Sequence, residues 1–158
     1  MQKHITIPYE FHALSELSAA DRQLIDQAIA ATRNSYSPYS HFRVGAAALL
    51  ADGTVFIGAN QENAAFPSGL CAERTALFAA QAQHPEQPVV ALAIAAGNAN
   101  SLTSKPISPC GACRQVMTEL EDRYHNEMRV MLYGTDGVYT FRSAHDLLPL
   151  SFIGDDMK

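Results

Sequence analysis

The order of short apolar segments along the chain places the strongest limit on its fold. "PVVALAIAAG" from Pro88 and "MRVMLYG" from Met128 are apolar runs of strand length. Each follows a segment with the spacing of a helix, at 71–83 and at 110–123. Strands that are apolar throughout need cover on both faces of their sheet. The alternation therefore predicts an α/β domain in which helices pack on a central sheet.

The first half of the chain adds a helix and a hairpin to this pattern. "SAADRQLIDQAIAATRN", at 18–34, has a capping serine, an aspartate three residues later and apolar residues at helical spacing. Two strand-like segments, 44–50 and 54–60, flank Asp52-Gly53, a pair typical of tight hairpin turns. A short "GVYTFR" element and a helix near "SAHDLLPL" complete the chain. No repeat or linker interrupts it, so we predict a single domain over residues 1–158.

Charge and cysteine content exclude several classes of protein. With 11 Lys and Arg against 16 Asp and Glu, the chain has no basic stripe for a nucleic acid polymer. No apolar run approaches the roughly 18 residues of a membrane span, and the N-terminus has no leader-like apolar core. We therefore expect a cytoplasmic protein without a membrane partner. An odd count of three cysteines argues against a disulfide framework and for metal or redox chemistry.

The three cysteines predict a zinc site. Cys110 and Cys113 lie at the predicted start of a helix, where backbone N–H groups favour thiolates. Alone, this pair could bind a metal, act in redox chemistry or consist of two buried structural thiols. Cys71 adds a third sulfur, and no histidine lies at ligand spacing from a cysteine. Structural zinc sites use four protein ligands, whereas catalytic sites leave one position open for water. The open, catalytic site is favoured.

Two charged residues follow Cys71 directly. Glu73 is close enough to exchange protons with a zinc-activated water, although a solvated glutamate at a helix start is the alternative. Three thiolates around zinc carry a formal charge of −1, which a donor to the sulfurs would offset. Arg74 or Arg114 could supply it; otherwise they are surface arginines.

The blocks around these cysteines resemble a known family. "SPYSHFRVGAAALL", "GANQENAAFPSGLCAERTAL", "SPCGACRQVM" and "LLPLSF" are similar, in order, to the short, three-cysteine, homotetrameric branch of the zinc-dependent cytidine deaminases. The likeness spans about residues 20–152. It implies a three-layer α/β/α sandwich around a mixed five-stranded sheet, with the first 15 or so residues as an extension. It also implies hydrolytic deamination of cytidine and deoxycytidine in pyrimidine salvage.

The resemblance assigns roles at the metal and at the base. Cys71, Cys110 and Cys113 would bind one zinc ion per chain. Glu73 would take a proton from the activated water, protonate N3 of cytosine and deliver a proton to the departing ammonia. The backbone at Ala72 would help to hold the base.

Further roles come from the resemblance alone. Asn60 and Glu62 match a pair that binds the ribose hydroxyls, and Phe42 an aromatic that packs on the pyrimidine. Without the family, the first two read as a polar loop and Phe42 as a core residue. Phe66 and Phe152 match residues that complete a neighbouring subunit's pocket in the tetramer.

This sequence departs from the family at three positions and leaves other functions open. Gln61 stands where an aliphatic residue is frequent, Phe66 where tyrosine is usual and Arg43 where proline is frequent. We expect Gln61 and Phe66 to affect the sugar side of the pocket or the contact between subunits.

A deaminase of a modified or antibiotic cytosine nucleoside is the nearest alternative function. A non-enzymatic structural zinc module and a redox pair at Cys110 and Cys113 are the others.

Overall fold

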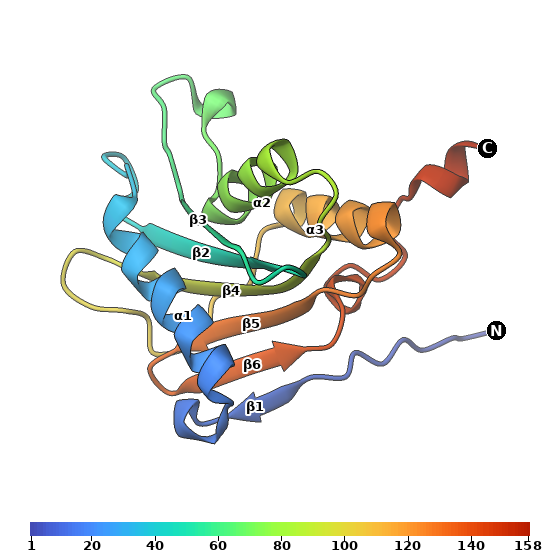
Figure 1. Ribbon diagram of the computed structural model, residues 1–158, viewed down its shortest axis with the longest axis horizontal. Coiled ribbons are helices and arrows are strands. Elements are labelled where there is room, and N and C mark those ends of the chain that lie inside the picture. The colour runs from blue at the N-terminus through green and yellow to red at the C-terminus, as the bar shows by residue number, and fades with distance from the viewer.

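A mixed six-stranded sheet forms the centre of the computed structural model, which describes residues 1–158 (Figure 1). Its strands lie in the order β1-β6-β5-β4-β2-β3. They are β1 (Glu10–His12), β2 (Arg43–Leu50), β3 (Val55–Ala59), β4 (Val89–Gly97), β5 (Arg129–Gly134) and β6 (Gly137–Phe141). Only β4 and β5 run parallel; the other neighbours are antiparallel. The predicted α/β class with a mixed sheet is confirmed.

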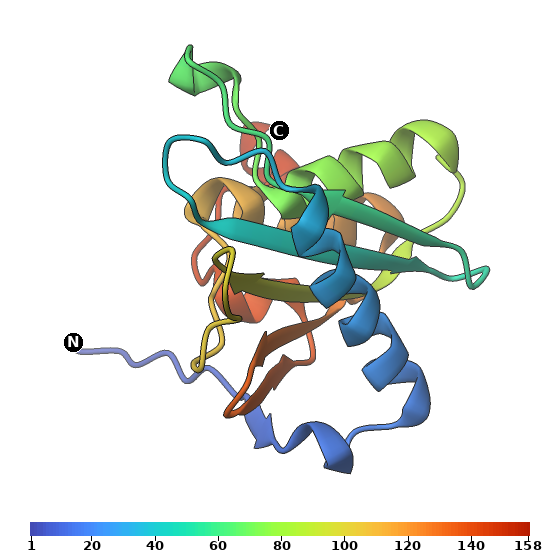
Figure 2. The same cartoon turned by 90° about the vertical axis from the view of Figure 1, so that its left-hand side faces the viewer.

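Helices cover both faces of this sheet, which gives three layers (Figures 1 and 2). The helix α1 (Ala19–Ala31) crosses one face, and α2 (Ala72–Gln83) and α3 (Gly111–Tyr124) lie on the other. The strand β4 shows why both faces need cover. Leu92 and Ile94 belong to the core cluster that contains α2 and α3, whereas Ala91 and Ala93 belong to the cluster under α1.

Glycine allows α2 to lie very close to the sheet. A methyl carbon at Gly58, in β3, would lie 2.5 Å from the backbone nitrogen of Ala76 and closer still to the carbonyl oxygen of Ala72. Ordinary van der Waals contact begins at 3.4 Å. The first turn of α2 is therefore seated directly on β3, which fixes where the residues at the start of this helix lie.

The sheet has one strand more than expected. β1 lies within the stretch predicted to be an N-terminal extension, and it pairs antiparallel with β6, with Glu10 opposite Thr140 and His12 opposite Val138. Tyr9, just before it, stacks on Phe141 at 5.7 Å between ring centroids. Residues 10–12 thus form one edge of the sheet.

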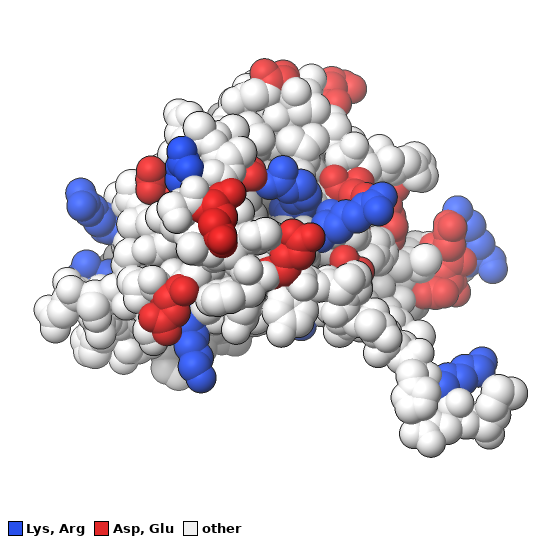
Figure 3. All heavy atoms as spheres, turned by 90° about the horizontal axis from the view of Figure 1, so that it is seen from below, with Lys and Arg blue, Asp and Glu red and all other residues white.

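Two further expectations concern the end of the chain and the surface. The helix expected near "SAHDLLPL" is a single 3₁₀ turn, Ala144–Leu147. On the face in Figure 3, acidic and basic side chains are interspersed, and the N-terminal segment projects from the lower right. No helix has both the length and the apolarity needed to cross a membrane.

Candidate metal centre

Two neighbouring helices begin at cysteines, and this brings all three sulfurs together. Cys71 is the N-cap of α2, Cys110 is the N-cap of α3, and Cys113 lies in the first turn of α3. The Sγ atom of Cys110 lies 3.7 Å from that of Cys71 and 3.5 Å from that of Cys113. All three sulfurs lie within 4.8 Å of one another. Cys113 is buried, Cys71 is half-buried and Cys110 is exposed, so the cluster is open on one side.

The spacing of the sulfurs fits zinc. A tetrahedron with Zn–S bonds of about 2.3 Å has S–S edges of about 3.8 Å. The two sulfur separations at Cys110, 3.7 and 3.5 Å, are close to this value. No histidine or carboxylate joins the three sulfurs as a fourth donor. The donor set is therefore that of a site with one position left for a non-protein ligand.

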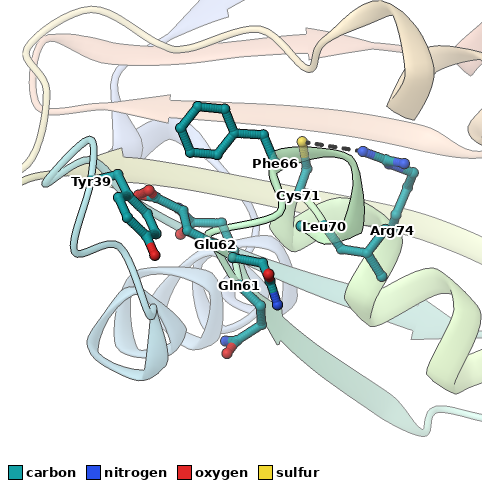
Figure 4. Close-up of a pocket in the computed structure, with 10 residues that line it drawn as sticks. Tyr39, Gln61, Glu62, Phe66, Leu70, Cys71 and Arg74 are labelled. Carbon is teal, nitrogen blue, oxygen red and sulfur yellow. Dashed lines mark hydrogen bonds between the residues drawn. The ribbon is translucent and has the colours of Figure 1, made fainter.

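One of the two candidate arginines contacts the cluster. The Nη2 atom of Arg74 lies 3.7 Å from Cys71 Sγ (Figure 4). Arg114 instead donates to the carbonyl oxygens of Pro109 and Leu147, at 2.8 and 2.7 Å. Arg74 is thus placed to offset negative charge on sulfur, whereas Arg114 holds the loop before α3 against the C-terminal part of the chain.

The pKa values of two of the sulfurs are shifted in opposite directions. A hydrogen bond from Cys113, opposed by burial and assisted by Arg74, lowers the pKa of Cys71 to about 5. The same pairing and burial raise the pKa of Cys113. One thiolate is therefore already favoured, and zinc replaces the remaining thiol protons when it binds.

Glu73 is buried beside this cluster. It occupies the first turn of α2, and only 4% of its surface is exposed, so it is not a solvated glutamate at a helix start. Burial, followed by the charge of Cys71, raises its pKa. A carboxyl group in such surroundings is typical of a site that moves protons.

A cavity of about 330 Å³ adjoins Cys71 (Figure 4). Asn60, Glu62 and Phe66 contribute to its wall, as do Cys71 and Arg74. Its other walls come from the loop before β2 and from the segment between β3 and α2.

Ala72, Phe42 and Phe152 do not line this cavity, and Phe66 lies at its rim. Ala72 is the first residue of α2 and is fully buried, and Phe42 is about one-third exposed at the end of the loop before β2. Phe152 follows α3 far along the chain and is 58% exposed; its carbonyl accepts a hydrogen bond from Gln115 at 2.8 Å. Phe66 is 75% exposed at the cavity rim, where its ring lies 5.7 Å from that of Tyr39. Neither Phe66 nor Phe152 is covered within one chain.

Asn60 fixes the loop that carries Phe42. Its Oδ1 accepts hydrogen bonds from the Val44 amide at 2.8 Å and the Ser35 hydroxyl at 2.6 Å, and its Nδ2 donates to the Phe42 carbonyl at 2.9 Å. The roles of the serines in this loop could not be predicted from the sequence, because a serine in a turn has no distinctive sequence pattern. Gln61 donates to the Asn34 carbonyl at 3.2 Å and so also holds this loop.

Comparisons with known proteins agree with this geometry. Residues 18–126 match the family described as "Cytidine and deoxycytidylate deaminase zinc-binding region". A cytidine deaminase of Halalkalibacterium halodurans is 46% identical over 139 residues, which cover 87% of this chain and 98% of that protein. One from Sporosarcina psychrophila is 40% identical and covers 86% and 93%.

Solved structures give the same result. The crystal structure of cytidine deaminase from Burkholderia pseudomallei aligns with a TM-score of 0.71 at 46% identity, covering 82% of this chain and 97% of that one. That of Mycobacterium tuberculosis aligns with a TM-score of 0.66 at 34% identity and covers 85% and 98%.

Proposed function

Because the chain belongs to the family of zinc-binding cytidine and deoxycytidylate deaminases, we propose that it hydrolyses cytidine and deoxycytidine to uridine and deoxyuridine, with release of ammonia. Such an enzyme is a hydrolase of a cyclic amidine C–N bond. The observation that carries the proposal is the buried carboxyl of Glu73 beside three converging sulfurs, with a nucleoside-sized cavity at Cys71.

The residues of the centre divide into metal ligands and a proton carrier. Cys71, Cys110 and Cys113 hold one zinc ion per chain, and Arg74 donates to the sulfur of Cys71. Zinc supplies a Lewis acid that makes water nucleophilic near neutral pH. Glu73 would accept a proton from that water and deliver it to N3 of the pyrimidine. It would then take the second proton from the hydroxyl added at C4 and pass it to the departing amino group.

The substrate is held by residues of three segments: the loop before β2, the segment after β3 and the start of α2. The backbone of Ala72 and the ring of Phe42 hold the base, and Asn60 and Glu62 bind the sugar hydroxyls. The cavity wall at Asn60 and Glu62 supports this assignment. A nucleoside rather than a polynucleotide fits a chain whose formal charge is −5.

Ultraviolet absorbance tests the proposal directly. Purified protein is incubated with cytidine, deoxycytidine and free cytosine, and zinc is measured on the same sample. We expect loss of the cytidine band in the wild type. Glu73→Gln should keep one zinc per chain and the same unfolding temperature but lose turnover, because only proton transfer is removed. A wild type that binds zinc and leaves every nucleoside unchanged would refute the proposal.

We further propose a homotetramer that acts in pyrimidine salvage in the cytoplasm. Phe66, at the rim of the cavity, and Phe152 support the tetramer, since large exposed rings are typical of surfaces covered by a partner. Three free thiols suit a reducing compartment. Sedimentation of the active enzyme tests the assembly, and a stable, fully active monomer would refute it.

A further inference from the structure

A serine that the proposed function does not use holds the Glu62 carboxylate. The Ser40 hydroxyl donates to Glu62 Oε1 at 2.7 Å. The Ser40 amide donates to the same carboxylate, at 3.1 Å from Oε1 and 3.2 Å from Oε2. Figure 4 shows the Glu62 side chain at the loop that bears Tyr39, the residue before Ser40. One residue thus makes three contacts to a carboxylate that lies in the cavity wall.

The same hydroxyl also connects Glu62 to Phe42. The Ser40 oxygen accepts a hydrogen bond from the Phe42 amide at 3.1 Å while its proton goes to Glu62. The carbonyl of Phe42 accepts from Asn60 Nδ2 at 2.9 Å. Glu62 is in turn tied back to the loop through its amide, which donates to the Tyr36 carbonyl at 2.8 Å. The loop and the segment after β3 therefore form one closed hydrogen-bond network.

The backbone of the loop is shaped to present Ser40. The His41 amide donates to the Ser37 carbonyl at 3.0 Å, which closes a five-residue turn, and His41 has a left-handed φ of 57°. A non-glycine residue in this region is uncommon and is maintained only where surrounding contacts require it. Here the turn holds both the amide and the hydroxyl of Ser40 on Glu62.

The network leaves Glu62 as a fixed hydrogen-bond acceptor. Partial desolvation would raise the pKa of Glu62, but the hydrogen bonds from the Ser40 side chain and backbone bring it below its ordinary value. The carboxylate therefore stays ionised, and its remaining lone pairs can only accept hydrogen bonds from a ligand. Hydroxyl groups of a sugar are donors of that kind. A half-exposed glutamate without such contacts would lose rotamer freedom on binding, which lowers affinity.

We propose that Ser40 is a positioning residue that fixes the Glu62 carboxylate for the sugar hydroxyls and couples it to the segment carrying Phe42. The inference rests on the proposed function, because it concerns the sugar side of the same site. Ser40 does not touch the reacting atoms, so its removal should affect recognition of the sugar more than the chemical step.

The test compares substrates with and without the 2′ and 3′ hydroxyls of the sugar. In Ser40→Ala, we expect KM for cytidine to rise roughly three- to tenfold, the effect of one lost charge-assisted hydrogen bond on an accessible group, with kcat within about twofold. KM for 2′,3′-dideoxycytidine should change by less than about twofold, because that sugar has no hydroxyl at C2′ or C3′ to present. Calorimetric binding of uridine and 2′,3′-dideoxyuridine should show the same difference without turnover.

Two further variants separate positioning from folding. Ser37→Ala removes a hydroxyl from the same turn, but only the Ser37 carbonyl joins the network, so its kinetics should match the wild type. Ser40→Thr keeps a hydroxyl and should recover most of the cytidine affinity. The unfolding temperature of each variant is measured alongside.

The outcomes distinguish the two proposals. If the wild type deaminates cytidine but Ser40→Ala changes KM equally for both nucleosides, or changes neither, the role of Ser40 is refuted alone. If the wild type neither converts nor binds any of these nucleosides, the proposed function falls and the role of Ser40 falls with it.

Discussion

Replacing Gly58 by alanine should disturb the metal centre indirectly. Gly58 lies in β3 against the first turn of α2, and Cys71 stands at the start of that helix. The added methyl carbon would lie 2.5 Å from the Ala76 nitrogen, about 0.9 Å inside ordinary contact, and closer to the Ala72 carbonyl. These are backbone atoms of a helix, so no side-chain rotation can relieve the clash. The first turn of α2, with Cys71 before it, must move by nearly 1 Å relative to α3, which carries the other two cysteines.

The size of the effect follows from packing and from zinc geometry. Overpacking a dense core costs about 1–3 kcal/mol. A loss of about 2 kcal/mol lowers the unfolding midpoint by about 4–8 °C for a chain of this length. Zinc distances are tolerated only within about 0.2 Å, so a shift of nearly 1 Å at one ligand should also weaken metal binding. We therefore expect a lower midpoint and less than one zinc per chain.

Thermal unfolding by circular dichroism, with zinc content measured by atomic emission, checks both expectations. Gly111→Ala is the matched control. It lies at the start of α3 beside Cys110, where a methyl carbon meets nothing within 4 Å. Alanine is also the better helix former, so this variant should keep its zinc and its midpoint. A Gly58→Ala protein with full zinc and an unchanged midpoint would show that α2 is not held on β3 as described.

Three other substitutions test separate parts of the site and its support. Cys110→Ala should lose zinc and unfold at a lower temperature, because the metal joins the starts of two helices; a variant that retained one zinc per chain would contradict the ligand assignment. Glu62→Gln should raise KM for cytidine more than for free cytosine, and equal effects would argue against a sugar contact. The buried amides of Met128 and Ala144 donate to Glu121 at 2.6 and 2.8 Å. Glu121→Ala leaves both amides without an acceptor, so it should lower the free energy of unfolding, measured by urea denaturation, by about 3 kcal/mol or more. Zinc content at low temperature should not change in that variant.

Local patterns were enough to predict much of this fold. The apolar runs of β4 and β5 and the helical spacing of α2 and α3 arise from residues close in sequence, and the observed bounds differ from the predicted ones by about one residue. The three cysteines could be grouped because each stands at the start of a predicted helix. Their convergence, 39 residues apart between Cys71 and Cys110, depends on how those helices pack, and here the family resemblance guided the interpretation.

Features that depend on distant pairing could not be predicted in this way. The strand β1 has only three residues, too few for a periodic signal, and it exists because β6 is there to pair with it. Ser40 contacts Glu62 across 22 residues of sequence. Glu121 reads as one more polar residue on an amphipathic helix, yet it is buried and binds the 3₁₀ turn at Ala144. None of these contacts leaves a pattern in its own stretch of sequence.

The extra strand at the N-terminus affects how the sheet faces other molecules. Without β1, the segment "GVYTF" of β6 would be an open edge, rich in β-branched and aromatic residues, and such edges invite pairing with other chains. β1 replaces it with a three-residue edge that begins two residues after Pro8 and contains Glu10. This edge is at the far side of the sheet from β2 and β3. The cavity is lined by the loop before β2 and the segment after β3. The strand that protects the sheet edge is therefore distant from the substrate cavity. Removal of the first twelve residues should lower the solubility of the protein more than its activity.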